Sequence, residues 1–427
     1  MIQLIPTVVQ QHAEEAVTLR TTRSYLVTAA HVQLFDLARA DERLAAHLDG
    51  LAVAGDEGSK TALDAVQEDP DPGLGEFFTA MVCAIEDRNE HRLEWLLDRA
   101  EASPQGRRGV ISAFGWVSTA SLQAIGRALL ASPRPFRREV GLAACAMHRV
   151  EAGEAITQAL QDADAALRAR ALRAAASAGR VALLPLCSGA MADADACCAY
   201  EAARAAALLG ERRAALEALE RIALAPGPWQ CSALMLLLKL HAPETGRRVL
   251  GSLPRNPEGV RLLIRGAGVA GDAQYVPWLI SQMSDDKLAR LAGEAFSFIT
   301  GLDLSEPGFY REPPEDVETG PTEDAEDEDV SLDEDEDLPW PDPARLDAWW
   351  RDNASRFTPG ARYFVGAPPS PPHGLGVLRH GYQRQRIAAA QWLCLLQPGT
   401  PLFNTATPAW RQKRWLNAME AKAAALN

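Results

Sequence analysis

Apolar residues recur at intervals of three and four positions along most of this chain, with polar and charged residues between them. This spacing places the apolar side chains on one face of an α-helix. The every-second-position alternation of Val, Ile and Thr that predicts strands is scarce. Ahead of residue 105 the pattern predicts helices over 8–19, 34–51, 59–67 and 77–100, the second ending at Gly50 or Gly55. The pattern therefore predicts an all-α protein.

A unit of 30 or 31 residues recurs through the middle of the chain. Its frames open at Arg107, Arg137, Arg168, Cys198, Trp229, Val260 and Arg290, and a second marker follows at His148, Gly179, Gly210, His241, Gly271 and Gly301. Each unit predicts a first helix that ends at this marker, a tight turn and a second helix. Glycine adopts the left-handed conformation of a helix C-terminus without a Cβ penalty, and histidine is enriched in it. A fixed period of this length predicts an α-solenoid of stacked helix pairs.

The regular spacing ends near residue 304, and an acidic stretch follows. Between Glu312 and Asp337 there are 15 acidic residues and no basic ones. This stretch carries the net charge of −14, because 42 acidic residues face 43 basic ones elsewhere. We expect four parts: an N-terminal helical lead-in over 1–104, the solenoid over 105–304, an acidic disordered linker over 305–343, and a Trp-rich C-terminal helical cap over 344–427.

Composition narrows the setting of the protein. Hydrophobic residues make up 47% of the chain, which is enough to bury a sizeable core. The seven cysteines form no CxxC pair and no Cys/His set with zinc-ligand spacing. The first ten residues lack the pattern of a signal peptide, and no apolar run reaches 18 residues. We therefore expect a soluble, cytoplasmic protein with no membrane insertion.

Helix pairs of about 30 residues, with arginine near the start, an alanine-rich first helix and glycine at its end, resemble the short HEAT-like repeats of bacterial proteins over residues 107–301. Three segments, at 41–55, 294–304 and 408–412, also resemble an uncharacterised HEAT-repeat family of proteobacteria that is encoded near type VI secretion clusters. That resemblance implies an accessory or adaptor role in the cytoplasm. It brings no catalytic residue, because the family has none established.

The residues offer no catalytic, cofactor or metal site. No GxxxxGK[ST] loop, HExxH or GxSxG elbow occurs in the sequence. We interpret His148 and His241 as structural helix ends, and His47 with Asp41 and Asp49 as a buried polar cluster. The candidate partner-binding residues are Arg137, Arg138, Arg168, Arg212, Arg247, Trp349 and Trp350. Arginine and tryptophan are frequent in interface hot spots, although such arginines also form intramolecular ion pairs and such tryptophans also seal helix stacks.

Three functions remain open at this point. We expect a non-enzymatic scaffold or adaptor that binds a protein, plausibly a type VI secretion component or effector. An immunity protein that neutralises a cognate toxin is a second option. A HEAT-like nucleic-acid-binding or DNA-repair protein is a third, which the near-neutral folded part disfavours. A HEAT-like metal hydroxylase is excluded, because the chain contains no His-Glu dipeptide.

The acidic stretch is either a solvated linker, a tether for a basic partner or a decoy over the arginines.

Overall fold

The computed structural model of the chain describes residues 4–314 and 335–425. These residues form 22 α-helices and four short 3-10 helices. Within the same ranges there is no strand, and the only β-type pairings are three isolated bridges. The all-α expectation is confirmed. No helix in the described part combines the length and the apolar character needed to cross a bilayer.

The chain divides into two compact units, which are described separately. Unit 1 contains residues 1–210 and 397–427, and unit 2 contains residues 211–396. The segment expected to form a single Trp-rich cap is therefore shared between the units. Trp340, Trp349, Trp350 and Trp392 lie in unit 2, and Trp410 and Trp415 lie in unit 1.

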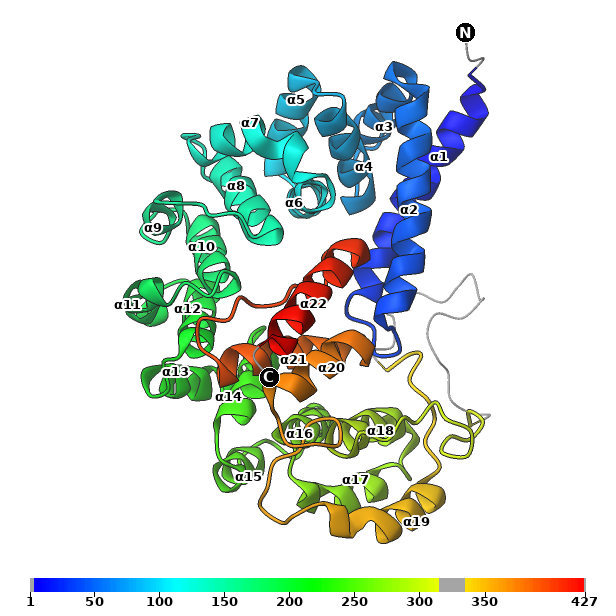
Figure 1. Cartoon of the computed structure of the whole chain (residues 1–427), viewed down its shortest axis with the longest axis vertical. Coiled ribbons are helices and arrows are strands. Elements are labelled where there is room, and N and C mark those ends of the chain that lie inside the picture. Colours follow the sequence, from blue (N-terminus) through cyan, green and yellow to red (C-terminus); the bar gives the residue numbers. More distant parts are fainter. Residues whose placement is uncertain (1–3, 315–334, 426–427) are drawn as a thin grey trace. The chain divides into compact units, whose positions relative to one another are not determined.

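Unit 1 is a two-layered stack of helices (Figure 1). Its helices are α1 (Pro6–Leu26), α2 (Leu34–Ala54), α3 (Asp56–Glu68), α4 (Leu74–Glu86), α5 (Glu90–Glu101), α6 (Pro104–Trp116), α7 (Thr119–Leu130), α8 (Pro135–His148), α9 (Ala155–Ala159), α10 (Ala165–Ser177), α11 (Leu184–Gly189), α12 (Ala196–Leu209) and α22 (Ala409–Ala424). Helices α4, α6, α8, α10 and α12 pack in succession, and the intervening helices pack on them as a second layer. Neighbouring helices thus pack in pairs, as expected of a solenoid.

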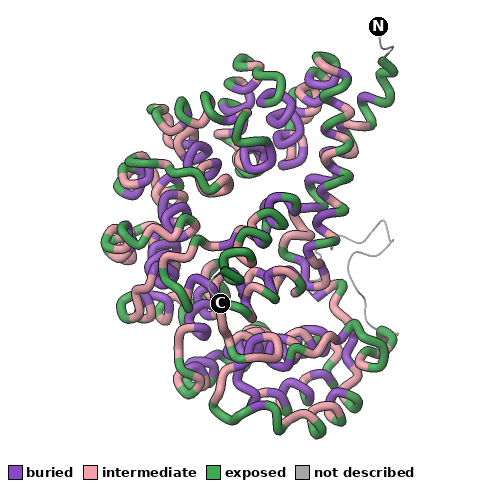
Figure 2. The backbone as a smooth tube through the Cα atoms, viewed as in Figure 1, coloured by how far each residue is buried: buried purple, intermediate pink, exposed green. Residues whose placement is uncertain are grey.

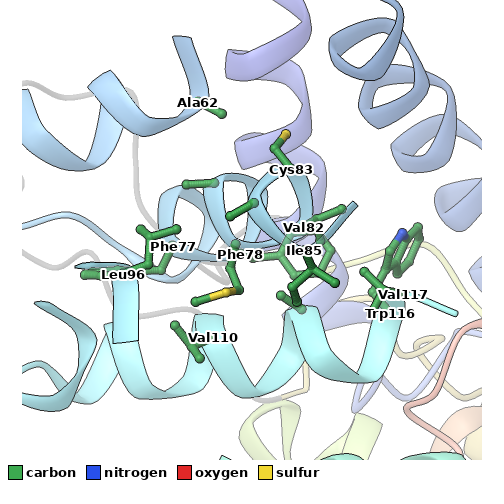
Figure 3. Packing of buried hydrophobic residues seen from close by; sticks show 14 of the residues in the cluster. Ala62, Phe77, Phe78, Val82, Cys83, Ile85, Leu96, Val110, Trp116 and Val117 are labelled. Atoms are coloured by element: carbon green, nitrogen blue, oxygen red, sulfur yellow. The ribbon is translucent and has the colours of Figure 1, made fainter. Parts of the chain in front are cut away.

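The core of unit 1 lies between these layers. Figure 3 shows Phe77, Phe78 and Ile85 of α4 pointing toward Val110 and Trp116 of α6. Phe77, Phe78, Ile85 and Val110 are fully buried. Burying one such side chain contributes roughly 1.5–3 kcal/mol, so the stacking of α4 on α6 supplies much of the stability that a single helix pair lacks.

Unit 2 is also built from two layers of helices. Its helices are α13 (Ala214–Ala223), α14 (Gln230–Leu240), α15 (Pro243–Gly251), α16 (Pro257–Ala270), α17 (Val276–Gln282), α18 (Asp286–Thr300), α19 (Pro343–Asn353), α20 (Pro371–His380) and α21 (Gln383–Leu396). Helix α16 packs between α14 and α18, with α13, α15 and α17 as their second layer. Figure 2 shows both buried and exposed positions on the helices of this unit, and the buried positions of α13 and α15 recur three or four residues apart, which explains the apolar spacing of the sequence.

One predicted helix is divided in the structure. The range 77–100 forms α4 and α5, and Arg88 between them has a left-handed backbone with φ of 55°. The sequence around residue 88 contains neither glycine nor proline, and its one signal for the break is Asn89, whose side chain caps α5. The prediction that α2 ends at a glycine is confirmed, because Gly55 caps it with φ of 61°.

The two marker histidines lie at helix ends, as interpreted, but neither has the left-handed backbone expected at the marker. His148 is the last residue of α8, and the left-handed residue is Arg149, with φ of 57°. His241 caps α14 with extended backbone. Burial is the main cause that lowers the pKa of both histidines, so the neutral form is favoured there over the cation. At the four marker glycines, Gly179, Gly210, Gly271 and Gly301, the left-handed backbone is present.

The flanks of the acidic stretch are part of unit 2. The Arg311 amide donates to the Trp340 carbonyl at 2.8 Å, and the Asp342 amide donates to the Phe309 carbonyl at 2.9 Å. Asp335 is buried and accepts from Arg261 at 2.6 Å. The central part of the expected disordered linker, residues 315–334, lies outside the described residues.

Candidate functional site

The predicted arginines of unit 1 hold neighbouring helix pairs together. Arg137 lies 2.5 Å from Glu94 and 2.8 Å from Asp98. Arg138 lies 2.5 Å from Asp162. Arg168 forms a two-pronged pair with Asp193, both contacts at 2.9 Å. Each of these arginines already has a carboxylate from another element of the stack, so its charge is largely compensated within the chain.

The candidate residues of unit 2 also have intramolecular contacts. Arg212 donates to the Leu395 carbonyl at 2.9 Å, and Arg247 forms an ion pair with the buried Asp272. The two tryptophans are half-buried. Trp349 packs edge-on against Phe296 at 5.8 Å, and Trp350 packs against Phe357 at 5.2 Å. The structure does not gather the seven candidates into one site, and their role in binding a partner stays a prediction.

A different feature of unit 1 is the segment of residues 397–411, the connection before α22 and the first residues of α22, which crosses the C-terminal ends of other helices. We call it the unit 1 crossing segment. Its Leu402 amide donates to the Ser177 carbonyl at the end of α10 at 3.1 Å. Arg411 donates to the Gly115 carbonyl at the end of α6 at 2.6 Å. Terminal helix carbonyls have no partner within their own helix, so this segment supplies the missing donors.

Unit 2 has its own crossing segment, residues 361–366. Arg362 donates to the carbonyls of Leu238, Lys239 and His241 at the end of α14 and to Ala270 at the end of α16. The amides of Tyr363 and Val365 donate to Gly271 and Phe298 at 2.8 and 2.7 Å. A Cβ on Gly271 would lie 2.0 Å from the Tyr363 carbonyl oxygen. The marker glycines thus serve two needs, a left-handed backbone and the close approach of another segment.

A cavity of about 280 Å³ lies in unit 1, beside its crossing segment. Four arginines line it: Arg20 and Arg23 from α1, Arg108 from α6, and Arg170 from α10. Ser24, Ser112, Asn404 and Thr407 add polar groups to the lining, and Trp116 and Met147 add apolar surface. The crossing segment closes one side through residues 404, 406, 407 and 408. We call this cavity the arginine pocket.

Arg20 is buried in the arginine pocket without a carboxylate partner. Its Nε and Nη2 donate to Ser112 Oγ at 2.9 and 2.6 Å, and its Nη1 donates to Ser24 Oγ at 2.7 Å. Its guanidinium carbon lies 5.2 Å from the centre of the Phe78 ring. Burial, followed by the charges of Arg23 and Arg108, lowers the pKa of Arg20 to about 9. Arg20 therefore remains a cation at neutral pH, with two hydroxyls as its hydrogen-bond acceptors.

The other three arginines of the pocket differ in how they are compensated. Arg23 forms a buried ion pair with Asp41, and Asp41 also accepts from the Ala409 amide at 2.6 Å. Arg170 lies 3.2 Å from Glu139. Arg108 is exposed and has no hydrogen bond or ion pair within the described ranges. Two of the four cations, Arg20 and Arg108, thus have no paired carboxylate, and the pocket is suited to an anion.

The sequence-based candidates include none of these four arginines. One signal was present: the buried positions of α1 run Val9, Ala13, Ala16, Arg20 and Arg23 at helical spacing. Two arginines therefore continue an apolar stripe, where a charge is costly without a partner. Arg108 is adjacent to Arg107, but only Arg107 has a carboxylate, Glu139, at 2.6 Å. The sequence does not distinguish the two.

Comparison with known proteins adds no family assignment. No protein-family model matches the chain, and no curated protein matches it. Within the part of the chain that the structure describes, no group of three or more His, Cys, Asp or Glu side chains is arranged to hold a metal ion. The arginine pocket is therefore the site on which a functional hypothesis for this chain can be built.

Proposed function

We propose that this chain is a non-enzymatic helical-repeat adaptor that binds another protein, and that the arginine pocket receives an acidic group of this partner. The observation that carries the proposal is a pair of cations, buried Arg20 and exposed Arg108, that form no ion pair with a carboxylate of the described residues and lie in a cavity open to solvent. A buried charge without a partner is unfavourable. An anion from a second molecule would compensate Arg20 and form charge-assisted hydrogen bonds.

The surroundings of the pocket favour recognition over chemistry. The groups that line it are arginines, hydroxyls, an amide and apolar side chains. Arginine is effectively always protonated and does not act as a proton acceptor near neutral pH. The rigid stack on which the pocket is built suits broad contact with a partner. The resemblance to proteins encoded near type VI secretion clusters makes a secretion component or effector the partner to look for first.

The experiment is affinity purification of the tagged full-length chain from its native host, followed by mass spectrometry. Wild type is compared with Arg108→Glu and with Arg99→Glu, an exposed arginine of α5 outside the pocket that carries the same charge change. We expect a specific partner that is retained by Arg99→Glu and lost by Arg108→Glu. A partner that both variants retain would refute the role of the pocket, and the absence of any enriched protein would refute the adaptor function.

The same purification separates the adaptor from the immunity protein. An adaptor is expected to co-purify with secretion components and an intact effector. An immunity protein is expected to hold one toxin and abolish its activity. Circular dichroism of each variant provides the folding control. Arg108 suits the test because its side chain is exposed, and substitutions at the surface usually change the free energy of unfolding by only about 0.5 kcal/mol.

A further inference from the structure

We infer that the arginine pocket is a phosphate-monoester site, so that the group it receives is a phosphorylated side chain of the partner and not a carboxylate. This inference rests on the proposed function, because the partner carries the phosphate. It is drawn from three properties of the pocket: the number of uncompensated charges, the state of the serine hydroxyls and the space available.

The charge of the pocket matches a dianion. Asp41 compensates Arg23, and Glu139 compensates Arg170 while it also pairs with Arg107. Arg20 and Arg108 remain without a paired carboxylate in the described part of the chain. A carboxylate would compensate only one of these two charges. A phosphate monoester carries about −1.5 to −2 charges at pH 7 and offers three strong acceptor oxygens.

The hydroxyl of Ser112 is oriented to act as a donor. It accepts two hydrogen bonds from Arg20, through Nε and Nη2. A hydroxyl has one proton and two lone pairs, so a Ser112 oxygen that accepts from Arg20 directs its own proton elsewhere. No acceptor for that proton is present among the described residues. Ser112 is also one of the residues that line the cavity, where a phosphate oxygen would accept its proton.

The space fits a small group at the end of a side chain. The volume of about 280 Å³ lies just below the range of roughly 300–1,000 Å³ that is typical of pockets for drug-sized ligands. The Asn404 amide and the apolar edge of Trp116 border the same space. The cavity is thus lined by arginine, serine and amide side chains, all of which can donate hydrogen bonds. This combination recognises a tetrahedral oxyanion, because one guanidinium group can donate to two phosphate oxygens at once.

The test uses the full-length protein and isothermal titration with four probes: inorganic phosphate, O-phosphoserine, sulfate and glutamate, at matched ionic strength. We expect phosphate and phosphoserine to bind and glutamate to bind at least tenfold more weakly. Arg108→Gln should weaken phosphate binding by about tenfold or more, as expected for the loss of a hydrogen bond to a charged group. Arg99→Gln is the matched control and should leave binding unchanged.

The dependence on pH identifies the dianion. The charged groups facing the cavity are its four arginines, together with Asp41 and Glu139, which pair with two of them. His148, which follows the pocket-lining Met147 and contacts the Phe114 carbonyl at 2.7 Å, has a pKa lowered mainly by burial, so its neutral form is favoured. A phosphate monoester has a second pKa near 6, so the affinity of O-phosphoserine should rise from pH 5.5 to 7.5, while that of sulfate stays constant.

The outcomes distinguish the two proposals. Glutamate binding as tightly as phosphoserine, or phosphate binding unaffected by Arg108→Gln, would overturn the phosphate assignment and leave the adaptor proposal standing. Phosphate binding that requires Arg108, combined with a partner that Arg108→Glu still captures, would leave a phosphate site that the partner does not use. A single-stranded oligonucleotide that binds more tightly than a phosphoserine peptide would overturn the assignment in favour of nucleic acid, whose phosphodiesters each carry one charge.

Discussion

The marker glycine Gly271 offers a direct test of why the sequence repeats glycine at the helix ends. Replacing Gly271 with alanine adds a Cβ at a backbone with φ of 70°, where it would lie 2.0 Å from the Tyr363 carbonyl oxygen. The left-handed backbone alone costs about 1–2 kcal/mol for an L-residue. The crowding also displaces Tyr363, whose amide donates to the Gly271 carbonyl at 2.8 Å, and such a bond contributes a net of about 1 kcal/mol. We therefore expect a loss of about 3 kcal/mol in the free energy of unfolding.

Two matched glycines of unit 2 separate these contributions. Gly360 has a left-handed backbone with φ of 77°, but a Cβ there has only one neighbour, 4.0 Å away. Gly360→Ala should therefore cost about 1–2 kcal/mol, from the backbone alone. Gly376 lies within α20, where a Cβ would meet nothing within 4 Å. Gly376→Ala should stabilise the protein by about 0.5–1 kcal/mol, because glycine loses more conformational freedom in a helix than alanine.

The measurement is urea unfolding followed by circular dichroism, together with hydrogen exchange of residues 361–366 read by mass spectrometry. Exchange in this segment should accelerate in Gly271→Ala and stay at the wild-type rate in Gly376→Ala. The reasoning is refuted if Gly271→Ala loses no more stability than Gly360→Ala and leaves exchange in the unit 2 crossing segment unchanged. In that case the left-handed backbone alone would account for the glycine.

Two further predictions concern buried titratable groups. Burial and the neighbouring Arg362 lower the pKa of Lys239 from 10.5 to about 7. At 1.36 kcal/mol per pKa unit, Lys239→Met should stabilise the protein at pH 7 by on the order of 4 kcal/mol. Between pH 7 and 10.5 the unfolded chain binds more protons than the folded chain, so the free energy of unfolding of the wild type should rise with pH. The free energy of unfolding of Lys239→Met should change less over the same window. Equal pH slopes for the two proteins would contradict the prediction. For His148, whose pKa is lowered, the unfolded state takes up the proton first as the pH falls below about 6.5. Stability should fall there, and His148→Gln should lessen the fall in acid titrations monitored by fluorescence.

The helices themselves were largely predictable from the sequence. Apolar spacing located α2 and α3 to within a few residues, because one face of each helix packs on its neighbours. The break at Arg88 was not predictable, since a left-handed arginine between α4 and α5 is imposed by packing and leaves no glycine or proline as a signal. The sequence predicted the left-handed backbone of the marker glycines, but it did not show which segments cross them. These segments are distant in sequence; Gly399, for example, lies beside Gly179.

The candidate site shows the same division. The sequence revealed arginine pairs, but it did not show that Arg138 and Arg168 have carboxylates 24 and 25 residues away. Neither did it show that Arg20 meets Ser112, 92 residues further along, in place of an acid. Periodicity along the chain determines which residues are helical and which face is apolar, since both depend on neighbours three or four positions apart. Compensation of a charge depends on distance in space, so only the tertiary structure decided which arginines stabilise the stack and which two remain available for an anion.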